Sequence, residues 1–217
     1  MISWNTSAPN GALAIRVRLD DETWSKPLPY VRWDEESRVS LGGHDDSARF
    51  DIDILMTSRP FTAIEVDATT KLAAVALATP PLQHPRDGKI EAIELDVPER
   101  SQYAGDRGST LCSPASLAML LAANGVDIDV TRAADATYDD AYHGTGNWTF
   151  NVALAGSFGL RSFVAFLRDL AHARTFLEAG VPLALSITWK KGQLDNPPIE
   201  ESEGHIVVLR GFDSDGN

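Results

Sequence analysis

The sequence predicts an α+β protein in which an all-β, sandwich-like segment precedes a segment that mixes helices and strands. Up to about residue 88, short runs alternate apolar and polar side chains, with the period of two that is typical of half-buried strands. Beyond that point, longer apolar stretches carry the start and stop residues of helices. Residues 79–88 hold three prolines and a glycine without periodicity, as a linker does. We therefore expect two domains, residues 1–88 and 89–217.

The composition excludes several classes of function. The 217 residues carry a net charge of −12, which argues against a nucleic-acid partner and against an anionic membrane surface. No apolar run approaches the length that spans a bilayer, so no membrane span is expected. The first residues have neither the basic nor the apolar region of a signal peptide. A single cysteine allows no intrachain disulfide, and no His/Cys spacing resembles a zinc pattern, so neither a metal nor a cofactor is expected.

Five strands are expected in the first segment, separated by Gly, Pro, Asp and Ser at spacings typical of a sandwich. They cover residues 12–19, 24–33, 50–56, 63–68 and 75–78.

Two groups in this segment have a functional alternative. Asp51 and Asp53 could ligate Ca²⁺, but two carboxylates two positions apart are also what a solvated strand face produces, which is our interpretation. Aromatic residues could form a platform for a carbohydrate, and we interpret them instead as core and strand-edge residues. They are Trp4, Trp24, Tyr30 and Trp33.

The second segment is organised around the only cysteine. Residues 111–125 form an apolar stretch that predicts a buried helix, with Pro114 in its first turn and Gly125 just past its end. Cys112 then lies at the helix N-terminus, where unpaired N–H groups and the helix dipole favour a thiolate. The alternative is a buried and inert cysteine, which is the commoner fate of a lone one.

The elements after this helix alternate between helices and strands. Helices are expected over residues 131–136, with Thr131 as N-cap, and over 151–157 and 169–179. Strands are expected over residues 162–167, 182–189 and 205–212, the last followed by a hairpin turn at 213–217. Two loops complete the segment: a glycine-punctuated loop at 142–150 and an acidic loop at 190–204.

His205 is the histidine with a catalytic context. It follows Gly204 at the start of a strand, where its ring can project from the sheet. Of the other four histidines, His143 in the glycine-punctuated loop stays a candidate for lining a cleft.

Three stretches resemble the C39-like peptidase family of papain-fold cysteine peptidases. They are Val97–Tyr103, Cys112–Met119 and Gly204–Phe212, and they carry a glutamine, a cysteine and a histidine in the order of that fold. A further stretch, Tyr142–Trp148 with Gly159 and Leu160, looks like bacterial members that carry an N-terminal β-rich domain. The resemblance covers residues 93–217 strongly and residues 3–78 weakly. It implies a papain-like domain, with the cysteine helix packed on an antiparallel sheet.

The resemblance also implies roles for single residues. Cys112 is the expected nucleophile, His205 its general acid and base, and Gln102 the side-chain donor to the oxyanion, beside the backbone N–H of Cys112. Family members place an Asp or Asn on the strand after the histidine strand. We expect that third residue, and the C-terminal strand or strands of the domain, to lie beyond residue 217, so residues 1–217 alone could fold and yet be inactive.

The leading hypothesis is a cysteine-nucleophile acyl hydrolase, in the first place a peptidase, which acts on peptides or on cell-envelope amides. The alternative is a noncatalytic carbohydrate- or cell-envelope-binding protein with a degenerate papain-like scaffold, in which the N-terminal domain holds the carbohydrate. The acidic loop near the expected cleft would favour basic peptides, although such loops are commonly solvated surface. The resemblance suggests a secreted or envelope location, while the start of the chain suggests no export signal.

Overall fold

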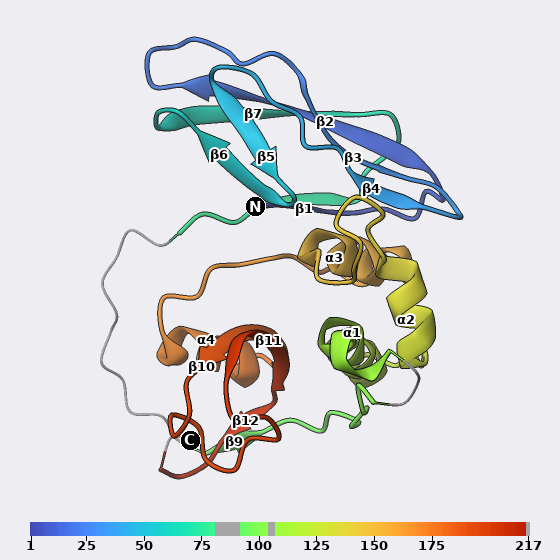
Figure 1. Ribbon diagram of the computed structural model, residues 1–217, viewed down its shortest axis with the longest axis vertical. Helices are drawn as coiled ribbons and strands as arrows, with labels where there is room; N and C mark the ends of the chain where they lie inside the picture. The colour runs from blue at the N-terminus through green and yellow to red at the C-terminus, as the bar shows by residue number, and fades with distance from the viewer. Residues whose placement is uncertain (81–91, 104–106, 216–217) are drawn as a thin grey trace. The chain divides into compact units, whose positions relative to one another are not determined.

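The computed structural model describes residues 1–80, 92–103 and 107–215, and in these it is a mixed α/β protein of antiparallel strands and four α-helices (Figure 1). The chain forms two compact units. The first consists of Met1–Thr79 with Ala136–Ala165, and the second of Pro80–Asp135 with Phe166–Asn217. The expected linker at 79–88 lies almost wholly outside the described residues, and the expected domain boundary at residue 88 stays a prediction.

A four-stranded antiparallel sheet forms the body of the first unit, in the order β4-β3-β2-β7. Its strands are β2 (Gly11–Leu19), β3 (Leu28–Trp33), β4 (Arg38–Ser40) and β7 (Phe61–Ala68). From Leu13 on, every second residue of β2 is buried, so the alternation read from the sequence puts Ile15 and Val17 into the core.

The strand β1 (Ile2–Asn5) pairs with β8 (Ala74–Leu77), and its Trp4 enters the same core. Trp4, Tyr30 and Trp33 are buried, with the Trp4 and Trp33 ring centroids 5.5 Å apart. Only Trp24 of the four aromatic residues is exposed, and the Arg16 guanidinium lies over its ring at 5.1 Å. A carbohydrate platform made from these rings is therefore not supported, because three of them face the interior.

The expected strand over residues 50–56 is a hairpin instead. β5 (Ala48–Asp51) and β6 (Ile54–Thr57) pair with each other, and Ile52 between them has a φ of 56°. Asp53 is buried in this turn, contrary to the expected solvated strand face, and burial raises the pKa of its carboxyl. Among the described residues, no three His, Cys, Asp or Glu side chains are grouped to hold a metal ion.

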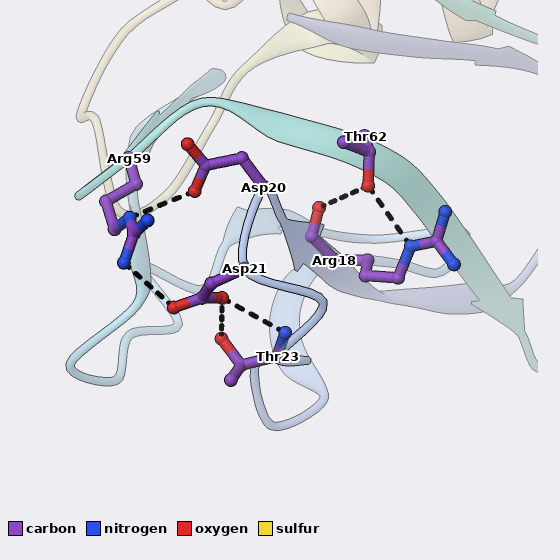
Figure 2. A network of polar contacts seen from close by, with 6 residues as sticks. All are labelled: Arg18, Asp20, Asp21, Thr23, Arg59 and Thr62. Carbon is purple, nitrogen blue, oxygen red and sulfur yellow. Dashed lines mark hydrogen bonds and ion pairs between the residues drawn. The ribbon is translucent and has the colours of Figure 1, made fainter.

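Exposed charged side chains fasten the turn after β2 to the start of β7 (Figure 2). The Arg59 guanidinium contacts the carboxylates of both Asp20 and Asp21 at 2.9 Å, and Asp21 in turn accepts hydrogen bonds from Thr23. The Arg18 Nε donates to Thr62 Oγ1 at 3.1 Å, across the pair β2 and β7. Because these groups are solvated, their main effect is to fix the turn rather than to stabilise the fold strongly.

Residues 136–165 belong to the first unit because α3 (Trp148–Ser157) packs on β1, as Figure 1 shows. The helix begins three residues earlier than expected, since Asn147 caps it by accepting from Thr149 N at 3.1 Å. The expected strand over 162–167 does not form. Its N–H groups at Ser162 and Val164 bond to the side chains of Asn5 and Ser3, not to a strand backbone.

The second unit holds the cysteine helix and two small antiparallel sheets. Its elements are β9 (Ile93–Glu94), the short 3-10 helix η1 (Gly108–Thr110), α1 (Cys112–Ala123), α4 (Leu170–Glu178), β10 (Leu183–Trp189), β11 (Ser202–Leu209) and β12 (Gly211–Phe212). β10 pairs with β11 and β9 with β12. The expected strand over 205–212 is thus broken at Arg210, where the chain changes its pairing partner from β10 to β9.

The helix α2 (Val130–Thr137) runs across the division between the two units. Its first turn is capped by Asp129, whose carboxylate accepts from Arg132 N at 2.7 Å, and not by the expected Thr131. No helix in the described part of the chain has both the length and the apolar character that a bilayer crossing requires.

Candidate active site

Cys112 is the first residue of α1, as the sequence predicts. Its side chain is half-buried, and the first turn of the helix carries no acidic residue that would oppose a negative sulfur. The other end of the helix is closed by Gly125, whose φ of 79° lets Gly125 N donate to Ala122 O and Val126 N to Leu121 O. The sequence signals at both ends therefore give a helix that starts with the sulfur.

His205 lies on β11, directly opposite Ile187 of β10. The Trp189 ring meets the His205 ring edge to face, with centroids 5.7 Å apart and planes at 82°. Burial lowers the pKa of His205, which favours a neutral ring near neutral pH. In the part of the chain that the structure describes, no hydrogen bond joins the imidazole to another group.

The helix that starts at Cys112 packs against the strand that carries His205. Ser116, one helical turn after the cysteine, donates from its Oγ to Ile206 O at 3.2 Å. Ser116 is almost fully buried in an otherwise apolar helix, so its hydroxyl cannot bond to water. The hydrogen bond to Ile206 O gives the hydroxyl a partner in place of water. The structure thus brings together the elements of the expected pair, although a direct contact between Sγ and the ring is not among the interactions of the described residues.

Gln102 lies six residues before Gly108, the first residue of η1, and η1 directly precedes α1. Its Nε2 donates to Gly108 O at 3.0 Å, and this bond uses one of the two amide hydrogens. Among the described residues the second hydrogen has no acceptor, so a bound substrate can receive it. The hydrogen bond to Gly108 O holds the Gln102 side chain against the first residue of η1, the 3-10 helix that leads into Cys112.

The sequence also offers His143 and the acidic loop at 190–204 as candidates. His143 is exposed, has a φ of 55° and belongs to the first unit, whereas α1 and β11 belong to the second. In the expected acidic loop, Glu200 forms an ion pair with Lys191, and Glu203, which lies on β11 in the structure, forms one with Lys190. Both pairs reduce the net charge available to attract a basic peptide.

Sequence reasoning missed Ser116 and Trp189. Ser116 is a polar residue within an apolar helix, which is a signal of a buried hydrogen bond, but nothing local names its partner ninety residues away. Trp189 ends a strand of alternating burial, and only the pairing register of β10 and β11 places it beside His205.

One of three comparisons with known proteins found a match. A family model described as the Peptidase_C39-like family matches residues 94–217, which is more than half of the chain. The chain belongs to the Peptidase C39-like family. As a C39-like protein it is a cysteine peptidase in general terms, with a peptide as the substrate class. No curated protein and no solved structure matches the chain.

Proposed function

We propose that this C39-like protein hydrolyses peptide or cell-envelope amide bonds with Cys112 as nucleophile and His205 as its proton carrier. The observation that carries the proposal is the packing contact between α1 and β11. The Ser116–Ile206 hydrogen bond at 3.2 Å fixes the helix that starts with the sulfur against the strand that bears the imidazole. A pair of groups on two elements needs such a fixed spacing to exchange a proton.

The chemistry follows from these roles. His205 accepts the Cys112 proton, and the thiolate attacks the substrate carbonyl carbon to form a tetrahedral intermediate. The oxyanion accepts hydrogen bonds from the backbone N–H of Cys112 and from the remaining N–H of Gln102. The imidazolium protonates the leaving amine, which departs and leaves a thioester. His205 then takes a proton from water, whose oxygen attacks the thioester and releases the acid and the free thiol.

Alkylation by iodoacetamide at pH 6 tests the cysteine–histidine pair without knowledge of the substrate. We expect the wild-type thiol to react in the folded protein, and His205→Ala to slow the reaction by about 100-fold, because the Cys112 thiol loses the base that accepts its proton. His44→Ala is the matched control, an exposed histidine in the first unit that should leave the rate unchanged. A wild-type thiol that reacts only after unfolding in urea would show an inert cysteine and end the proposal.

The role of Gln102 needs a second measurement, because alkylation forms no oxyanion. We expect Gln102→Ala to lower peptide hydrolysis by about 100- to 1,000-fold while the alkylation rate at pH 6 stays within a factor of about two. Its Nε2 also holds Gly108 O, so the unfolding midpoint in urea is measured alongside. An equal loss in both assays would mean that Gln102 only supports the turn before α1.

A further inference from the structure

The pairing of β10 with β11 places an indole next to the candidate histidine. Ile187 pairs with His205, and because side chains alternate along a strand, Trp189 shares the face of both. The register then shifts, so that Trp189 pairs with Ser202 and the extra residue lies on β11, between Ser202 and His205. Such a bulge re-aims the side chains beside it. The two rings become a diagonal cross-strand pair in edge-to-face contact.

Besides its contact with the His205 ring, the Trp189 indole makes a hydrogen bond of its own. Its Nε1 donates to Ile199 O at 3.3 Å, in the loop between the two strands, and only 5% of Trp189 is exposed. A ring fixed by a hydrogen bond, by its strand and by burial has little freedom to turn. His205, by contrast, has no hydrogen-bond partner for its ring among the described residues, so the aromatic contact is the specific interaction that limits its rotation.

We propose that Trp189 is a positioning residue for His205: its ring fixes the plane of the imidazole and keeps water from that side. The proposal rests on the function proposed above and adds to it the device that aligns the proton carrier. With 5% exposure, the indole is not a surface for substrate, so it acts through the histidine. Edge-to-face pairs have a preferred geometry, which is what orientation requires.

The charge environment of His205 is simple enough for a titration to report on the indole. On β10, α1 and β11, the elements packed together here, the titratable side chains besides His205 are Cys112 and Glu203. Glu203 is exposed and paired with Lys190. In a Cys112→Ser background the ring therefore titrates with burial as its main perturbation, and burial lowers the pKa of His205.

The test compares Trp189→Leu, Trp189→Phe and a matched control. Trp33→Leu removes another buried indole, which also donates to a backbone carbonyl, at 3.1 Å, but which lies in the first unit. For Trp189→Leu we expect alkylation of Cys112 by iodoacetamide at pH 6 to fall about 3- to 10-fold. In the Cys112→Ser background, we expect the pKa of His205, followed by NMR, to rise as water reaches the ring. Trp189→Phe keeps an edge-to-face partner and should stay near wild type in both, as should Trp33→Leu.

Each outcome decides a separate claim. If His205→Ala reacts as fast as wild type, the proposed function fails whatever Trp189 does. If His205→Ala is slow but Trp189→Leu matches wild type, only the positioning role is overturned, and a Phe variant as impaired as the Leu variant overturns it too. Should Trp189→Leu not fold, the wild-type protein decides: an NOE between the Trp189 and His205 ring protons together with an intact Phe variant supports the role, and its absence refutes it.

Discussion

At the scale of single residues, Asn5 shows how one buried amide can join distant parts of the chain. Its Nδ2 donates to Ser162 O at 3.1 Å and its Oδ1 accepts from Ser162 N at 3.2 Å, with 3% of the residue exposed. We expect Asn5→Ala to lower the free energy of unfolding by about 2–3 kcal/mol, because both backbone groups of the partly buried Ser162 lose their partner. Urea denaturation measures the change.

The control for Asn5 is Asn124→Ala, an exposed amide whose Nδ2 donates to Leu120 O at 2.9 Å. Its loss should cost less than about 1 kcal/mol, since water replaces the bond. Equal effects of the two variants would contradict the importance given to burial at Asn5.

The sequence predicts residues correctly where the determinants are local. Cys112 starts its helix because Pro114 and Gly125, both within thirteen residues, mark the start and the end. Ser116 and Trp189 could not be assigned in this way. Their roles depend on Ile206 and His205, which only the folded pairing of α1, β10 and β11 brings to them.

At the scale of elements, the end of α1 offers a direct test of the left-handed residue that closes it. Gly125 has a φ of 79°, and a Cβ there would meet no atom within 4 Å, so the backbone conformation alone opposes a side chain. We expect Gly125→Ala to destabilise the protein by about 1 kcal/mol in urea denaturation. The rate of Cys112 alkylation in the folded protein should not change, because the sulfur lies at the other end of the helix.

Gly204 provides the matched comparison. A Cβ at this position would also meet open space, but Gly204 has no positive φ, so Gly204→Ala should leave the free energy of unfolding unchanged or raise it by about 0.5 kcal/mol. If both alanine variants were equally destabilised, the strain assigned to Gly125 would be refuted.

Element boundaries were predictable only where local pattern and long-range pairing agree. Residues 50–56 alternate like a strand, yet the alternation continues through a turn at Ile52 and Asp53 and hides the hairpin. Residues 162–167 have the composition of a strand, but they form no strand ladder with β1. Their N–H groups at Ser162 and Val164 donate to the side chains of Asn5 and Ser3 on β1 instead of to its backbone. Both differences come from partners that the local sequence does not contain.

At the scale of the whole molecule, the family match and the compact units divide the chain differently. The match begins at residue 94 and includes residues 136–165, which pack with Met1–Thr79. The sequence pattern changes once along the chain, near residue 88. The packing does not divide at that point, because α3 comes after it and contributes Phe150 to the core that also contains Trp4. The sequence could indicate a β-rich first part and a mixed second part, but not that a segment of the second returns to the first.

This return of the chain predicts the outcome of a truncation. A protein of residues 92–217 leaves Phe150 without Trp4, whose ring centroid lies 5.9 Å away in the full chain, and leaves α3 without β1. We expect α3 to lose its protection from hydrogen exchange in the truncated protein, since an isolated helix of ten residues is marginal in water. In the full chain, Trp4→Ala should cost about 3–5 kcal/mol by opening the same core. Protected amides over residues 148–157 in the truncated protein, with cooperative unfolding in urea, would instead support an autonomous second domain that begins near residue 89.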